Sequence, residues 1–260
     1  MRDGAATRID EELERIERAV EAGQSDLRAL GYWRLVGRIK RDPAAIRRYA
    51  DAAGRIDRAA FEARVRPRFP VWVGNAILVA GTVVLAALVP VAIALAEGID
   101  RPRPELAGAL LVVAAGGLSV SVHGPAHWVA GRTLGIRFAG WFLGGPFRIQ
   151  PGLKVEYASY LRADPTSRAA MHAAGALASK VAPFAVFGPA YIQHVRHGWA
   201  LLPAWSLWAI LGLGVLQILT DIVWSTKRSD WKRVRRELRL AREEPVLSSG
   251  GEPGSSGQPG

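Results

Sequence analysis

Two histidines, His123 and His127, have the type and spacing that a catalytic or metal site would need. They are four residues apart, near the end of a long apolar run. On an α-helix, side chains four residues apart lie on the same face, one turn above the other. Two imidazoles placed in this way can share one metal ion, and zinc is the usual ion for such a pair.

The residue after His123 determines what such a site could do. In the zinc helix His-Glu-x-x-His, the glutamate that follows the first histidine is the general base. Here that position is Gly124. Losing a general base typically costs about 10²–10⁴ in rate. If the missing carboxylate is what limits an otherwise intact zinc site, Gly124→Glu is expected to create or raise peptidase activity by that factor. Glu156 or Asp164, farther along the chain, is the alternative source of a base.

The elements that must position these residues are four apolar blocks. Each is longer than the roughly 20 residues that a membrane-spanning helix needs. The third block contains one charged residue, Lys180, the fourth contains Asp221, and the first two contain none. We therefore expect a mainly α-helical, polytopic membrane protein with four transmembrane helices. The blocks are 69–96, 106–131, 169–192 and 199–226.

The net charge of +11 predicts an orientation rather than a nucleic-acid partner. Of the 34 Lys and Arg residues, 16 precede the first block, six lie between the second and third blocks, and eight follow the fourth. This asymmetry is the positive-inside pattern. It predicts an integral protein of a prokaryotic plasma membrane, with both termini and the loop 132–168 in the cytoplasm. There is no cysteine, so disulfides are excluded.

The regions outside the spans are expected to be helical or disordered. Residues 1–68 form a cytosolic region with short amphipathic helices, because apolar residues recur there every three to four positions. Asp42-Pro43 is typical of a cap followed by proline at the first helical position. Residues 69–226 form the membrane domain, and 227–244 a basic helix suited to anionic membrane lipids. Residues 245–260, rich in Gly, Ser and Pro, should be disordered.

The cytoplasmic loop between the second and third spans is predicted to contain a β-hairpin. Its 37 residues are too many for a plain connection. Residues 138–142 and 147–157 are apolar or aromatic, and Gly144-Gly145-Pro146 between them is turn-like. The second piece alternates in polarity, as half-buried strands do. We expect this hairpin to associate with the cytoplasmic membrane surface.

Topology suggests a third metal ligand. Counted from the flanking charges at 1.5 Å per residue, His127, His172 and Asp221 lie at one level, roughly 6–9 Å inside the cytoplasmic boundary. Two histidines and a carboxylate, with a fourth position open, form a hydrolytic zinc site. The alternative is that Asp221 is the counter-ion of Lys180. That alternative requires bridging about 10 Å of depth, because Lys180 lies about 18 Å inside the boundary.

Over residues 106–221, the chain resembles the site-2 protease family of intramembrane zinc metalloproteases. His123-Gly-Pro-Ala-His127, then Gly131 and Leu134-Gly135-Ile136, are similar to the family's zinc helix and its continuation. Residues 174–179 are similar to its Ala-Gly-Pro-x-x-Asn stretch, with Ser179 in place of Asn. The resemblance implies one Zn²⁺ ion, with Asp221 as the third ligand. It also makes Ser179 a candidate for contacting substrate or supporting the ligands. His172, by its shared level, and Lys180, by its place inside the membrane, are further candidates.

Three functions follow from these features. The first is a divergent intramembrane metallopeptidase that acts on transmembrane segments of other proteins. The second is a non-catalytic relative that keeps the metal and holds such segments. The third is an unrelated membrane protein that passes protons or ions by way of His172, Lys180 and Asp221. Because the ligands are present and the catalytic glutamate is not, the sequence leaves enzymatic activity open.

Overall fold

The computed structural model describes residues 2–98, 101–144, 150–197, 201–223 and 229–248, and these are mainly helical. In chain order the elements are α1 (Arg2–Glu21), α2 (Tyr32–Ile39), α3 (Pro43–Arg64), β1 (Arg68–Phe69), α4 (Val71–Glu97), α5 (Pro104–Ser121), α6 (His123–Thr133), β2 (Phe138–Gly144), β3 (Gln150–Val155), α7 (Tyr157–Arg162), α8 (Pro165–His197), α9 (Ala204–Val223) and α10 (Asp230–Ser248).

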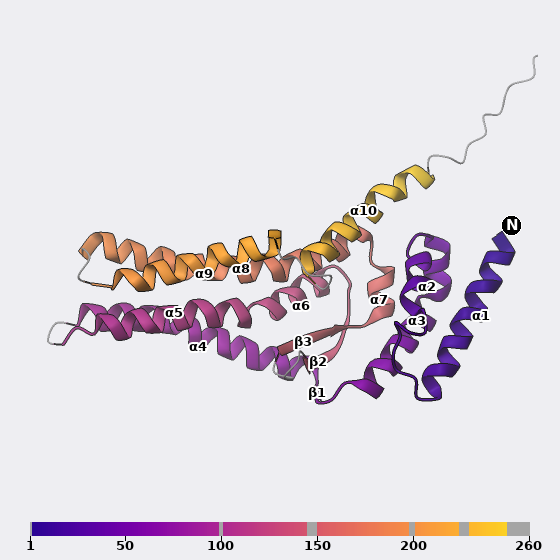
Figure 1. Cartoon of the computed structure of the whole chain (residues 1–260), viewed down its shortest axis with the longest axis horizontal. Coiled ribbons are helices and arrows are strands. Elements are labelled where there is room, and N and C mark those ends of the chain that lie inside the picture. Colours follow the sequence, from indigo (N-terminus) through magenta and orange to yellow (C-terminus); the bar gives the residue numbers. More distant parts are fainter. Residues whose placement is uncertain (1, 99–100, 145–149, 198–200, 224–228, 249–260) are drawn as a thin grey trace, which may run out of the picture.

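The four expected membrane spans are present as helices. Four stretches are long and apolar enough to cross a bilayer: α4, α5 together with α6, α8, and α9 as far as Asp221. They lie side by side at one end of the molecule, and α1–α3 lie at the other (Figure 1). Large apolar side chains such as Trp72, Val83 and Trp208 are exposed on the outside of the bundle. Such exposure is expected for a surface that faces lipid rather than water.

The second span is divided at Val122, directly before His123. Pro125 lies three residues after this division. Proline lacks an N–H and clashes with the carbonyl four residues before it, here that of Ser121. The disturbance therefore falls one turn ahead of the proline, and α6 begins with the first histidine.

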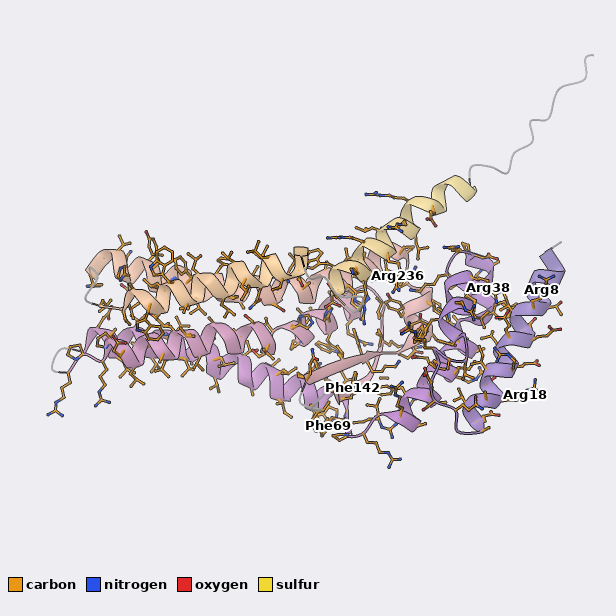
Figure 2. The ribbon with its side chains drawn as sticks, viewed as in Figure 1. Arg8, Arg18, Arg38, Phe69, Phe142 and Arg236 are labelled. Carbon is orange, nitrogen blue, oxygen red and sulfur yellow. The ribbon has the colours of Figure 1, made fainter. Side chains whose placement is uncertain are left out.

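The N-terminal helices form their own hydrophobic core, as the apolar spacing predicted. Leu13, Ile16 and Leu35 are at most 4% exposed and belong to the same buried cluster. The predicted cap at Asp42 is also confirmed, since its side chain accepts a hydrogen bond from the backbone N–H of Ala44 at 2.8 Å. Arg8 and Arg18 are exposed on these helices, and the Arg38 guanidinium of α2 pairs with the Glu12 carboxylate of α1 at 2.6 Å (Figure 2).

A small antiparallel sheet lies between the two ends of the molecule. β2 and β3 pair as expected, and β1 adds a third strand on the other edge of β2, in the order β1-β2-β3. Phe69 and Phe142 mark these neighbouring strands in Figure 2. The second strand was expected to reach Tyr157 but ends at Val155. The carboxylate of Glu156 caps helix α7 by accepting from the N–H groups of Ala158 and Ser159, so Tyr157 begins a helix.

Two elements connect the bundle to the N-terminal helices. α7 packs against α3, where a Cβ on Gly54 would lie 2.9 Å from the Cβ of Ala158. α10 packs along α8 and continues as a helix to Ser248, past the expected boundary at residue 244. The rest of the expected disordered tail, residues 249–260, lies outside the described residues.

Two helical glycines in the N-terminal region should respond oppositely to alanine. Gly54→Ala should lower the free energy of unfolding by about 1–3 kcal/mol, because the new methyl group overpacks the contact with α7. Gly37→Ala, where a Cβ meets nothing within 4 Å, should be neutral or stabilise by up to about 1 kcal/mol. Thermal unfolding of both variants checks this, and equal effects would contradict the close packing of α3 on α7.

Candidate metal centre

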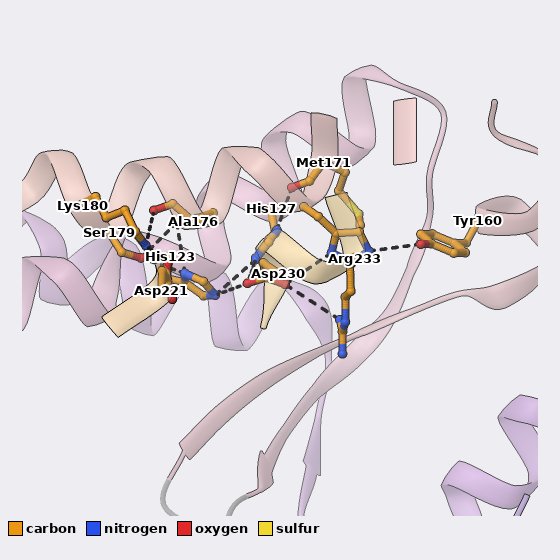
Figure 3. A network of polar contacts seen from close by, with 12 residues as sticks. His123, His127, Tyr160, Met171, Ala176, Ser179, Lys180, Asp221, Asp230 and Arg233 are labelled. Carbon is orange, nitrogen blue, oxygen red and sulfur yellow. Dashed lines mark hydrogen bonds and ion pairs between the residues drawn. The ribbon is translucent and has the colours of Figure 1, made fainter. Parts of the chain in front are cut away.

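Both histidines point at one carboxylate, that of Asp230 (Figure 3). The Nε2 atoms of His123 and His127 are 3.2 Å apart. Asp230 Oδ2 lies 3.4 Å from the first and 3.3 Å from the second. Among the residues that the structure describes, these three form the one group of His, Cys, Asp or Glu side chains that could hold a metal ion.

The spacing of the three atoms fits a tetrahedral ion. Zinc bonds to His nitrogen and carboxylate oxygen are about 2.0–2.2 Å long, which places neighbouring ligand atoms of a tetrahedron about 3.3–3.6 Å apart. The observed separations of 3.2, 3.3 and 3.4 Å match this range or lie just below it. The donor set, two imidazoles and one carboxylate, is also the one found in hydrolytic zinc sites.

The other ring nitrogens determine which tautomer each histidine adopts. His127 Nδ1 lies 2.7 Å from the carbonyl oxygen of Met171, which can only accept, so Nδ1 carries the proton and donates. His123 Nδ1 likewise lies 3.0 Å from the carbonyl of Gly175 and 2.8 Å from Ser179 Oγ. In these tautomers, both Nε2 atoms direct lone pairs at the Asp230 carboxylate. Three electron-pair donors this close repel one another unless a cation lies between them, either a metal ion or a proton on one ring.

Helix α8 leaves room for the imidazole of His127 at Gly175. A Cβ on Gly175 would lie 2.3 Å from His127 Nε2, so only glycine leaves room for the ring there. Ser179, one turn further along, donates to the Gly175 carbonyl at 3.0 Å while facing His123 Nδ1. Ser179 thus contacts the ring nitrogen of His123 that faces away from Asp230. Outer contacts of this kind orient metal-binding histidines.

Asp230 enters the centre as an anion. Burial raises the pKa of its carboxyl, but contacts with His123, His127 and His172 outweigh this and hold the pKa well below its usual value. The side chain of His123 is 41% exposed, whereas those of His127 and Asp230 are 13% and 18% exposed. The centre is therefore open on the side of His123.

The structure corrects the expectation that Asp221 is the third ligand. Asp221 forms an ion pair with Lys180 instead, which was the disfavoured alternative. The expected depths of Lys180 and Asp221 start from the charges at the cytoplasmic ends of their helices. Because α8 has 33 residues and α9 has 20, those ends do not lie at the same level. Counted from the opposite turn, Lys180 is 17 residues before the end of α8 at His197, and Asp221 is 17 residues after Ala204, the start of α9. Equal counts at 1.5 Å per residue place the two charges at one level.

His172 belongs to the centre, but not as a ligand of the cluster. It is 4% exposed, and its Nδ1 lies 3.4 Å from Asp230 Oδ1, the oxygen turned away from the histidine pair. Its Nε2 lies 3.1 Å from the hydroxyl of Tyr160 on α7 (Figure 3). His172 therefore links the carboxylate of the centre to a buried tyrosine.

Gly124, where the resemblance implies a general base, is covered by an aromatic ring. A Cβ on Gly124 would lie 2.0 Å from Cη2 of Trp141, a residue of β2 that is 4% exposed. On its other side the indole lies against Gly74 of α4, where a Cβ would meet Cδ1 at 2.2 Å. The indole N–H donates to Asn75 Oδ1 at 3.1 Å, which holds the ring in this slot. The Trp141 indole therefore fills the space that a side chain at position 124 would need.

The two acids considered as substitute bases have structural roles. Glu156 caps α7 and lies 3.4 Å from the Arg137 guanidinium. The Asp164 carboxylate accepts from the backbone N–H of Ser167 at the start of α8. It also accepts from the hydroxyl groups of Thr166 and Ser167 in the same turn. Hydrogen bonds from Ser167 and Thr166 lower the pKa of Asp164 to about 2, against the opposing effect of burial. Neither acid belongs to the metal-type cluster.

Sequence reasoning missed Asp230 and Trp141. Asp230 lies at the start of a basic helix that the sequence predicts to bind anionic lipids, and such a helix gives no reason to expect a metal ligand. The feature of the sequence that could have identified Asp230 is its seven-residue spacing from Glu237, which puts two acids on one helical face. Trp141 gave no local signal, because only the tertiary structure sets β2 against α4 and α6.

Metal analysis should distinguish Asp230 from Asp221. The purified wild-type protein should retain one zinc ion per chain after dialysis, and His127→Ala or Asp230→Asn should lose it. Losing a ligand should weaken binding by more than the roughly 10–100-fold that losing a supporting hydrogen bond costs. The control is Asp221→Asn combined with Lys180→Met, which removes both members of that pair and should keep zinc. Zinc loss in this control alone would restore Asp221 as the ligand.

A double-mutant cycle tests the contact between Gly124 and Trp141. Gly124→Ala should destabilise the protein by about 1–3 kcal/mol through overpacking. The same change in a Trp141→Ala background should cost little, because the cavity left by the indole accepts the methyl group. Additive effects, measured by thermal unfolding in detergent, would mean that the two residues do not touch.

Comparison of the chain with protein-family models, with curated proteins and with solved structures returned no match.

Proposed function

We propose that this chain is an integral membrane zinc protein of the site-2 protease type that holds extended segments of other membrane proteins. It does so without cleaving them through a carboxylate base. The observation that carries the proposal is the Trp141 indole packed against Gly124, one residue from a ligand histidine. Metal ligands and the loss of the base thus occur together in one centre.

In this proposal, His123 Nε2, His127 Nε2 and Asp230 Oδ2 hold the ion. A bound zinc ion would act as a Lewis acid toward a carbonyl group of the held segment. Ser179 and the carbonyls of Gly175 and Met171 keep the imidazoles in the tautomer that directs Nε2 at the ion.

Hydrolysis would also need a group that takes a proton from the attacking water. Within the described part of the chain, the cluster contains one carboxylate, and Asp230 is already engaged with both ligand histidines. Trp141 has an N–H donor and no basic atom in the position where the glutamate would be. The proposal therefore assigns binding, rather than rapid turnover, to this centre.

The sheet supplies a surface for an extended segment. β3 is the outer strand in the order β1-β2-β3, whereas the far edge of β2 is covered by β1. The sheet lies close to the centre, since Phe138 of β2 packs where a Cβ on Gly131 of α6 would be. An edge strand offers backbone groups to a segment that adds as a further strand. With the termini in the cytoplasm, sheet and centre would lie at the cytoplasmic end of the bundle.

A peptidase assay on a transmembrane segment tests the proposal. Wild-type turnover should equal that of the His127→Ala blank. Gly124→Glu alone should gain nothing, because Trp141 occupies the space, and this replaces the simple gain expected from the sequence. Gly124→Glu with Trp141→Ala should gain roughly 10²–10⁴-fold. Zinc-dependent wild-type turnover above the blank would make the chain a working metallopeptidase.

Holding can be measured separately by photo-crosslinking. A crosslinking residue at Gln150, exposed at the start of β3, should capture the segment. The matched control is the same residue at Arg34, exposed on the N-terminal helices, which should capture none. Equal capture at both positions would contradict a binding site at the sheet edge.

A further inference from the structure

Glu237, on α10, is a fully buried carboxylate that joins three elements. Its exposed fraction is 0%, and its Oε2 accepts from Arg168 Nε of α8 at 2.7 Å. Its Oε1 accepts from Lys40 Nζ at 2.7 Å and from the Tyr160 hydroxyl of α7 at 3.1 Å. Lys40 directly follows α2, so the N-terminal helices contact α10 through this carboxylate.

The cationic partners are buried with it. The side chains of Lys40 and Arg168 are 6% and 1% exposed. Arg168 also donates to the carbonyls of Leu161 and Ala163 at 3.1 and 2.8 Å, and the Lys40 ammonium lies over the Tyr160 ring, 4.6 Å from its centre. Burial lowers the pKa of Lys40 to about 8, with Glu237 opposing this shift. A buried carboxylate with two such partners fixes α10 firmly, because moving it would strand both charges.

The same helix supplies the third metal ligand. Asp230 is the first residue of α10, and Glu237 follows two turns later on the same face. Val234, between them, is 7% exposed, so this face is buried along its length. A rigid helix anchored at Glu237 therefore determines where the Asp230 carboxylate lies.

A polar chain joins the two carboxylates independently of the α10 backbone. The Tyr160 hydroxyl lies 3.1 Å from both Glu237 Oε1 and His172 Nε2, and His172 Nδ1 lies 3.4 Å from Asp230 Oδ1. Each of these groups is buried or nearly so. The centre and the N-terminal region are thus connected both by α10 and by side-chain contacts.

We propose that Glu237 is a positioning residue of the metal centre, and that docking of the N-terminal helices through Lys40 sets how tightly the centre binds its ion. The inference rests on the proposed zinc site. It makes metal binding conditional on a region that contributes no ligand to the centre. Undocking of α1–α3 removes the Lys40 partner of Glu237, which loosens the placement of α10 on α8 and weakens the hold of Asp230 on the ion.

Lys40→Met is the informative variant. It removes the link to the N-terminal helices and leaves Glu237 paired with Arg168, so α10 keeps its contact with α8. Zinc affinity, measured by chelator competition on the full chain in detergent, should fall about 10–100-fold. The matched control is Arg41→Met, which removes the adjacent, exposed charge and should leave affinity unchanged. With Co²⁺ at saturation, Lys40→Met should also alter the visible spectrum of the ion, and Arg41→Met should not.

The thermodynamic linkage between docking of the N-terminal helices and metal binding can also be tested on the wild-type protein. If docking strengthens metal binding, then metal binding must strengthen docking by the same factor. Adding Zn²⁺ to the wild type should slow amide hydrogen exchange in α2, and Asp230→Asn should abolish the effect. Unchanged zinc affinity in Lys40→Met, or unchanged exchange in α2, would overturn the inference. A wild type that binds no zinc at all would instead refute the proposed metal function.

Discussion

The candidate centre depends on where one anion lies. Two histidines a turn apart on α6 direct their lone pairs at the same point, and a cation is held there only if a third donor arrives from another element. Asp230 is that donor, 3.3 and 3.4 Å from the two Nε2 atoms. It comes from the start of α10 rather than from a membrane span. The candidate metal site therefore depends on how α10 is placed on α8.

Acidic side chains of the helical bundle and of α10 each contact particular cations or imidazole rings. Asp221 pairs with Lys180 between α8 and α9, Asp230 faces the histidines, and Glu237 holds Lys40 and Arg168. A buried charge without a partner costs far more than an exposed one. Such matching restricts how the helices slide past one another, and it gives α10 two acids with separate tasks.

The space beside the candidate centre is filled by the Trp141 indole, which two glycines accommodate. Trp141 occupies a slot made by Gly74 on one side and Gly124 on the other, and neither glycine could carry a Cβ without moving the ring. The slot joins β2 to both α4 and α6, so the sheet is held against the candidate metal centre by the residue that covers Gly124. This packing depends on the absence of a side chain at position 124.

Local features of this protein followed from the sequence alone. The spans, the amphipathic N-terminal helices, the Asp42 cap, the paired strands and the shared face of His123 and His127 depend on composition and periodicity within short windows. The choice between Asp221 and Asp230 did not follow, because helical periodicity tells which face a residue is on but not how far one helix has slid along another. The contacts of Trp141 and Glu237 were likewise decided only when elements distant in sequence packed together, since burial depends on what covers a side chain.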